Sequence, residues 1–314
     1  MLDAALVYDV APGVCWPALS VGQCRHLFSD CAARLGLRVD VIDLEWGEAA
    51  PPDRIGQLLT GDTQHDIKAV LIVHNETATG VTSDIGAIRS AMDAAKHPAL
   101  LHVDGVSSIA SLDFRFDEWK VDFAIAGSQK GFMMPAGLGL LCVSEKGLAM
   151  ADSAKCARVF FDLRDQAKQN ALGSFPYTPA LAHLFGLREA LDMLFEEGMD
   201  NVIARHHRLA EGVRRAVRAW GLAICAQDPK TYSGTVTAVL VPDGKNAAAV
   251  IDIAFRRYNL ALGGGLGRLA GKVFRIGHVG DLNDLMLLGA LSGVEMALND
   301  AGIPVTLGSG VAAA

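Results

Sequence analysis

Two charged side chains stand where they could take part in chemistry. Asp104 follows the short apolar segment Ala99–Val103, and Lys130 follows Val121–Ala126 in a turn bounded by glycines. Such segments are typical of parallel strands, and reactive groups collect at the carboxyl ends of these strands, on the loops that follow. We therefore expect both side chains at one edge of a sheet.

Each of these residues also has a structural interpretation. A strand-end aspartate such as Asp104 often caps the next turn, and a lysine between glycines is most often a solvated loop residue. The pair is more specific than either residue. An aspartate opposite a pyridinium nitrogen and a lysine that forms a Schiff base are what pyridoxal 5′-phosphate (PLP) requires. The carboxylate keeps the ring nitrogen protonated, and the lysine holds the aldehyde and moves the proton.

Two further segments join polar groups to apolar strands. His74–Gly80 follows Ile67–Val73, a continuous apolar run that is typical of a central parallel strand. Arg275 lies inside the apolar segment Val273–His278 and is costly to bury without a partner. A structural ion pair is one interpretation. We favour the other, in which the guanidinium binds a substrate carboxylate through two parallel hydrogen bonds.

The order of the predicted elements indicates an α/β fold. Strands alternate with helices over the first part of the chain, as in a doubly wound, mostly parallel sheet. After Thr178-Pro179, two long helical patterns precede a mixture of strands and helices, which predicts a smaller α+β domain. We place the large domain at residues 1–185 and the small domain at 186–314, expect Ser83 to cap a helix, and expect the last eight residues to be flexible.

The composition excludes several functions. The chain has 314 residues, 51% of them hydrophobic, with 28 basic and 35 acidic residues and a net charge of −7. No basic stripe predicts nucleic-acid binding, and no uncharged apolar run reaches the ~20 residues that span a bilayer. The six cysteines lack metal-binding spacing, so we expect no metal and a cytoplasmic protein with reduced thiols.

Five segments in order resemble class V aminotransferases of PLP fold type I: HNETATGV, VDGVSS, GSQKGF, FPYTP and VFRIGH. Each motif is weak alone, but the set is specific and covers nearly the whole chain. The similarity is greatest to serine–glyoxylate and alanine– or aspartate–glyoxylate aminotransferases. Gln129 favours aminotransferases over the related cysteine desulfurases, which usually have histidine there.

The resemblance implies a role for each matching residue. Lys130 would bind the cofactor's aldehyde carbon, and Asp104 its ring nitrogen. Arg275 would bind the substrate carboxylate. The remaining implied roles are Thr77 at the phenolic oxygen, Val106 on the ring face, Ser128 and Gln129 beside the phosphate and ring, Tyr177 at the substrate, and Thr178 at the phosphate. The family's FPYTP segment reaches the neighbouring subunit's site, so a homodimer with shared active sites is implied.

The sequence also departs from the family. Family members carry roughly seventy residues before the point that matches Leu2, including a loop that binds the PLP phosphate through backbone N–H groups. Val21 stands where many relatives have an aromatic residue that stacks on the cofactor.

Two main hypotheses follow. The first is a transaminase that moves the amino group of an amino acid, with L-serine as first choice, to glyoxylate, which gives glycine and a 2-oxo acid. The second is a truncated member of the family that is weak or inactive. Lower weight goes to an alanine– or aspartate–glyoxylate aminotransferase and to a PLP lyase or desulfurase.

Overall fold

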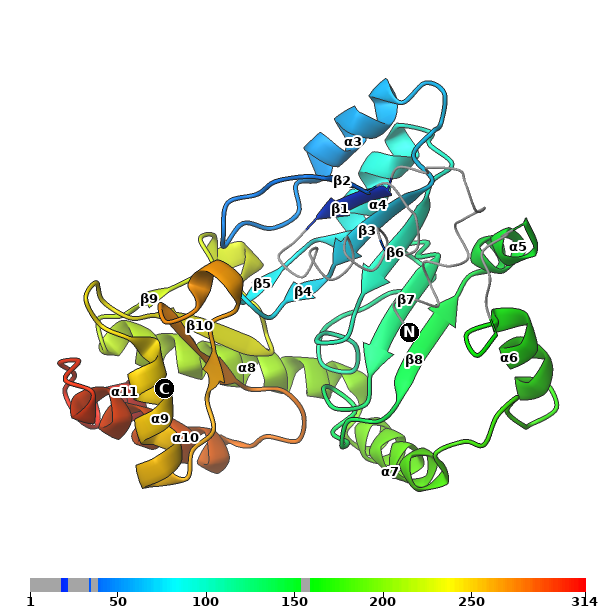
Figure 1. Ribbon diagram of the computed structural model, residues 1–314. Helices are drawn as coiled ribbons and strands as arrows, with labels where there is room; N and C mark the ends of the chain where they lie inside the picture. The colour runs from blue at the N-terminus through cyan, green and yellow to red at the C-terminus, as the bar shows by residue number, and fades with distance from the viewer. Residues whose placement is uncertain (1–17, 22–33, 35–38, 154–158) are drawn as a thin grey trace.

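The computed structural model describes residues 18–21, 34, 39–153 and 159–314. A six-stranded and a four-stranded β-sheet, each with its own helices, and a two-stranded hairpin organise this part of the chain (Figure 1). The expected fold class, an α/β unit followed by a smaller α+β unit, is confirmed. The predicted domain boundary at residue 185 falls inside helix α7 (Leu181–Glu197) and stays a prediction.

The larger sheet has the strand order β2-β1-β3-β6-β7-β8. All neighbouring strands are parallel except β8, which runs antiparallel to β7. All five residues of β3 are buried, as expected for a central strand. The strands are β1 (Ala18–Val21), β2 (Val39–Val41), β3 (Ala69–Val73), β6 (Leu100–Asp104), β7 (Phe123–Gly127) and β8 (Gly139–Val143).

Helices α3 (Pro52–Gly61) and α4 (Ile85–Ala94) pack their apolar faces on this sheet. Helix α3 starts at a proline, and the predicted cap of α4, Ser83, was wrong. Asp84 caps it by accepting a hydrogen bond from the Ala87 amide at 2.8 Å. Ser83 instead accepts a hydrogen bond from the Ala50 amide, so a tertiary contact takes its hydroxyl. Helices α5 (Glu145–Ser153) and α6 (Leu163–Asn170) follow β8.

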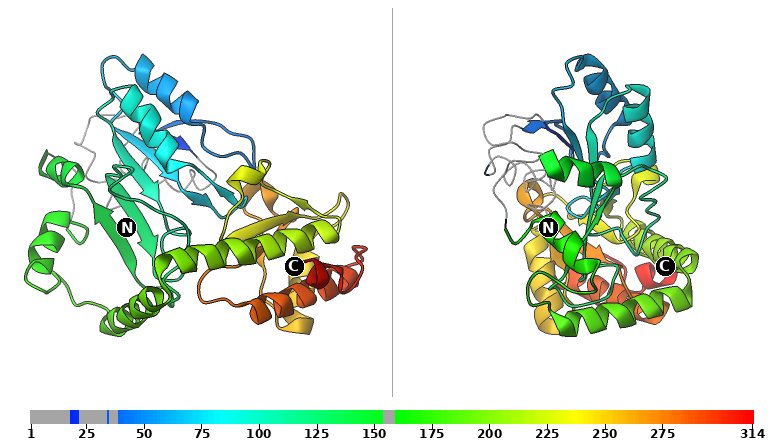
Figure 2. Two further views of the ribbon diagram at one scale, coloured as in Figure 1. Left: turned by 180° about the vertical axis from the view of Figure 1, so that it is seen from behind. Right: turned by 90° about the vertical axis from the view of Figure 1, so that its right-hand side faces the viewer.

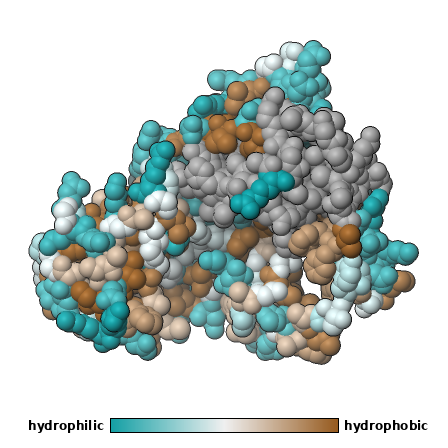
Figure 3. Space-filling view, in the orientation of Figure 1, coloured by the Kyte–Doolittle hydropathy of each residue, from teal (hydrophilic) through white to brown (hydrophobic). Residues whose placement is uncertain are grey.

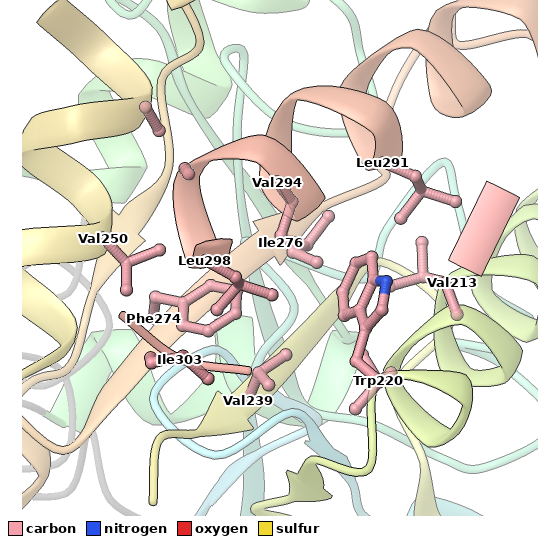
Figure 4. Close-up of a cluster of buried hydrophobic side chains, with 14 of the residues drawn as sticks. Val213, Trp220, Val239, Val250, Phe274, Ile276, Leu291, Val294, Leu298 and Ile303 are labelled. Carbon is pink, nitrogen blue, oxygen red and sulfur yellow. The ribbon is translucent and has the colours of Figure 1, made fainter. Parts of the chain in front are cut away.

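The smaller sheet is antiparallel, in the order β11-β12-β10-β9. Side chains such as Phe274, Trp220 and Leu291 fill a core between this sheet and its helices (Figure 4). Long helix α8 runs from beside α7 to this core (Figures 1 and 2). The elements are α8 (Met199–Ala219), β9 (Ala223–Ile224), β10 (Val236–Leu240), α9 (Ala247–Tyr258), β11 (Gly263–Gly264), β12 (Val273–Gly277) and α10 (Asp284–Asp300), with short 3-10 turns at Pro229–Thr231 and Gly267–Leu269.

The C-terminal tail is ordered, so the expectation of a flexible tail was wrong. It forms helix α11 (Ser309–Ala313). A buried carboxylate binds backbone amides where this helix begins. Glu295 on α10 is 2% exposed and accepts hydrogen bonds from the Trp220 indole and from the Gly308 and Gly310 amides. Burial acts to raise the pKa of Glu295, but these N–H donors outweigh burial and hold its pKa below the usual range.

We expect Glu295→Gln to lower the free energy of unfolding by about 2 kcal/mol, because an amide replaces a charged acceptor in front of N–H donors. The loss should shrink as the pH falls below the ordinary glutamate range, since the native carboxylate then takes up a proton. Urea denaturation measures the effect. The exposed Glu196→Gln is the control, and equal stabilities of the two variants would contradict the prediction.

Candidate active site

Three strands of the larger sheet end side by side. In the sheet register Val73 pairs with Asp104, and Asp104 pairs with Ile125. The segments that follow β3, β6 and β7 therefore leave the sheet at one edge, as predicted. The first of these segments contains the two-stranded hairpin of β4 (Asn75–Glu76) and β5 (Val81–Thr82).

Asp104 is the last residue of β6. It caps a turn, as its structural interpretation predicts, and it is also a candidate carboxylate for a ligand. Its Oδ1 accepts a hydrogen bond from the Val106 amide at 2.9 Å and so caps the turn. Burial raises the pKa of Asp104 to about 6, and the charge of Glu76 contributes in the same direction. No ion pair joins this carboxylate to any residue of the described ranges. A buried carboxylate in this state favours a cationic ligand atom.

The turn that carries Lys130 is closed by its own hydrogen bonds. The Ser128 hydroxyl donates to the Pro135 carbonyl at 2.8 Å and accepts from the Leu138 amide at 3.1 Å. Ser128 is thus fully buried, whereas Lys130 is half-buried and Gln129 is exposed. The predicted contacts of Ser128 and Gln129 with the cofactor stay predictions.

Gly131 brings this turn against the segment that follows Asp104. A Cβ at Gly131 would lie only 2.2 Å from the Ile109 carbonyl oxygen, a distance that no side chain tolerates. Glycine is therefore required here. The close approach places the backbone beside Lys130 against the turn that Asp104 begins.

Arg275 joins the smaller sheet to the hairpin that follows β3. It lies on β12, and its Nη1 donates to the Thr77 carbonyl at 2.9 Å while its Nε donates to the Gly264 carbonyl at 2.8 Å. The guanidinium and Thr77 are thus held together. The implied bond from the Thr77 hydroxyl to the cofactor and the ring contact of the half-buried Val106 stay predictions.

Tyr177 and Thr178 lie in the segment before α7, on the surface of the described part of the chain. Both are exposed, and the Tyr177 ring stacks on Phe160 with centroids 5.0 Å apart. Within the described ranges, neither residue makes a hydrogen bond or ring contact with Lys130 or Arg275. Their predicted roles at a neighbouring subunit's site stay predictions.

Sequence reasoning missed Asn75, Ser107 and Thr235, three buried polar residues that are hydrogen-bonded to one another behind the strand ends. For Asn75 the sequence gives a weak indication, because an amide stands close behind an apolar strand. It holds none for the third, which is 160 residues further along the chain.

Other chemistry finds little support in the described ranges. Burial raises the pKa of Cys225 to about 11, so its thiol stays protonated and is a poor candidate for a desulfurase nucleophile. No cluster of three or more possible metal ligands occurs among the described residues. None of the helices in that part of the chain is long and apolar enough to cross a membrane.

Comparison with known proteins decides the family. Residues 25–266 match the family Aminotransferase class-V. The chain belongs to the class V aminotransferases. The serine–glyoxylate aminotransferase of Methylorubrum extorquens is 60% identical over 99% of this chain and 79% of its own length. The L-aspartate–glyoxylate aminotransferase of Paracoccus denitrificans is 50% identical, with 99% and 79% coverage.

Solved structures agree with this assignment. Pyridoxamine–pyruvate aminotransferase from Mesorhizobium loti superposes with a TM-score of 0.91 at 30% identity, over 99% of this aminotransferase and 80% of that chain. The fold is thus PLP fold type I, and the cofactor of the family is PLP. The residues present fit this cofactor, because Asp104 is a buried carboxylate for which a protonated ring nitrogen would supply the opposite charge.

Proposed function

We propose that this aminotransferase transfers the amino group of L-serine to glyoxylate, giving hydroxypyruvate and glycine. The relatives named as serine–glyoxylate aminotransferases support the choice of substrates. The proposal is supported by the placement of Asp104 at the end of β6, of Lys130 in the turn that Gly131 packs against the segment behind Asp104, and of Arg275 against the Thr77 carbonyl.

Each of these residues has a task in amino transfer. PLP, when bound, supplies an electron sink for the electron pair released at the substrate Cα. Asp104 would hold the ring nitrogen in its protonated form, Lys130 would move the proton between the substrate Cα and the cofactor's C4′, and Arg275 would orient the carboxylate of each substrate in turn. Thr77 would hold the phenolic oxygen, and the carbonyl of the same residue fixes Arg275.

The amino donor is tested directly by the rates of glycine formation from glyoxylate with L-serine, L-alanine and L-aspartate. We expect the highest kcat/KM with serine. L-Aspartate is the second candidate, because one relative at 50% identity bears that activity in its name. Preference for another donor would overturn the choice of serine, and failure to form glycine from any of them would favour the weak or inactive member.

We also infer that the enzyme is a homodimer whose subunits share active sites. Exposed apolar side chains extend from the segment before α7 into that helix: Tyr177, Leu181, Phe185 and Phe195 are 43%, 59%, 76% and 69% exposed. Figure 3 shows apolar atoms on this side of the molecule, toward its lower right. Patches of this kind mark interaction sites. A cytoplasmic location stays a prediction that rests on the cysteine pattern.

We expect Phe185→Asp to weaken the dimer by at least about tenfold, because it puts a charge into an apolar contact. Sedimentation velocity over a concentration series measures the shift toward monomer. Phe255→Asp is the matched control, since Phe255 is a similarly exposed phenylalanine on a helix of the smaller unit. If both variants sediment like the unmodified chain, α7 is not the dimer interface.

A further inference from the structure

A buried amide links the hairpin that follows β3 to the segment that precedes β10. Asn75 is 2% exposed, and its Nδ2 donates to the Ser107 hydroxyl at 2.8 Å and to the Thr235 hydroxyl at 2.9 Å. Its Oδ1 accepts a hydrogen bond from the Thr82 hydroxyl at 3.0 Å. Ser107 and Thr235 are also buried, at 7% and 2% exposed. The amide thus uses both of its donors and its acceptor.

Two hydroxyl groups of this cluster donate to backbone carbonyls. The Ser107 hydroxyl donates a hydrogen bond to the backbone carbonyl of Asn75 at 2.6 Å. The Thr235 hydroxyl gives its proton to the Ser107 carbonyl at 3.0 Å. Both hydroxyl oxygens therefore accept from Asn75, whose amide supplies two N–H donors.

The three partners belong to the segments that carry the site. Asn75 stands two residues before Thr77, whose carbonyl holds Arg275. Ser107 stands three residues after Asp104. Thr235 precedes β10, which pairs with β12, and its carbonyl accepts from the amide of His278 beyond Arg275. The amide therefore reinforces the direct hydrogen bond between Thr235 and Ser107 and is a bridge that ties the segment behind Asp104 to the segment that precedes β10.

We propose that Asn75 is a positioning residue that sets the distance between Asp104 and Arg275. This inference rests on the proposed function. A substrate joined to the cofactor through its nitrogen reaches Arg275 only if that distance is correct. A carboxylate that is not joined to the cofactor adapts to a small displacement. The two kinds of ligand should therefore respond differently when the bridge is cut.

The test compares two ligands of the PLP-loaded protein by absorbance titration. α-Methyl-L-serine has the amine that replaces the Lys130 nitrogen and the carboxylate for Arg275, but no Cα proton to lose. 3-Hydroxypropionate has the same carboxylate without the amine. For Asn75→Ala we expect α-methylserine to bind about tenfold more weakly, as for one lost buried hydrogen bond. The affinities for 3-hydroxypropionate and for PLP should change by less than about threefold.

Variants of the partners separate positioning from general damage. Thr235→Val cuts the same bridge from the other sheet and should reproduce the loss, and combining it with Asn75→Ala should add little. Thr235→Ser keeps the hydroxyl and should bind like the unmodified chain. Thr82→Val is the matched control, because that hydrogen bond stays within the hairpin and leaves the bridge intact.

The outcomes distinguish this inference from the proposed function. Parallel loss of both ligands, or an equal loss in Thr82→Val, would show that Asn75 only supports the local fold. If the unmodified chain binds PLP but not α-methylserine, the proposed function fails and the inference fails with it. If the unmodified chain binds both and the bridge variants bind equally well, only the inference fails.

Discussion

Lys130→Ala is expected to reduce amino transfer by a factor on the order of 10⁴, because the change removes the only proposed carrier of the Cα proton. In the proposed mechanism the same amine would also hold the cofactor's aldehyde. Lys130 is half-buried at the edge where β7 ends. Gly131, which has no side chain, lets the turn of Lys130 pack against the segment that follows Asp104. Glycine formation from L-serine and glyoxylate measures the effect.

Two controls belong to this measurement. Lys245→Ala removes an exposed lysine of the smaller unit and should leave the rate unchanged. A small primary amine added to Lys130→Ala should restore part of the rate, because it supplies the missing base. The mechanism is wrong if Lys130→Ala keeps a rate comparable to that of the Lys245 variant.

Asp104→Asn is expected to separate activity from stability. Without the carboxylate the ring nitrogen loses its proton, so the rate should fall by about 10³-fold or more. The stability of the cofactor-free protein, in contrast, should rise. Burial raises the pKa of Asp104 to about 6, whereas the ordinary value is 3.8. Its neutral form is therefore the one that the fold prefers.

The sign of the pH dependence follows. The preference for the neutral acid stabilises the cofactor-free chain fully below the unfolded pKa, and this contribution is lost as the pH rises through about 6. A shift of this size corresponds to about 3 kcal/mol. Asparagine is neutral at every pH, so the stability difference between variant and unmodified chain should grow in the variant's favour from pH 4 to pH 8.

Urea denaturation of both cofactor-free proteins at several pH values measures this difference. PLP should abolish it in the unmodified chain by supplying the opposite charge. Identical pH profiles of the variant and the unmodified chain would mean that Asp104 is ionised and already compensated without the cofactor. The cofactor-nitrogen role would then lose its physical support.

The parts of the fold that the sequence predicted share a local cause. The strands β3, β6 and β7 are short apolar runs, and the chemistry-bearing residues follow them directly, so the edge that carries Asp104 and Lys130 was foreseeable. Two-residue strands such as β9 and β11 have no pattern of their own. They form because longer neighbours present free hydrogen-bonding edges.

The errors and omissions arise from contacts distant in sequence. Ser83 and Asp84 are both good capping residues, and Ser83 loses the role because Ala50 takes its hydroxyl. The tail is held by Glu295, whose burial on α10 leaves no trace in the tail's own composition. Asn75 finds Thr235 only after two sheets have come together, which no local pattern encodes.

The strand order of the larger sheet has a consequence for how the protein folds. From β3 through β6 and β7 to β8, neighbouring strands are separated in sequence only by a hairpin, helix or turn segment. Closing the loops between them therefore costs little conformational entropy. The contact from Asn75 to Thr235 closes a loop of 160 residues and carries a larger entropic cost. We therefore expect the segments of Asp104 and Lys130 to come together early in folding, and Arg275 to join them only when the second sheet docks.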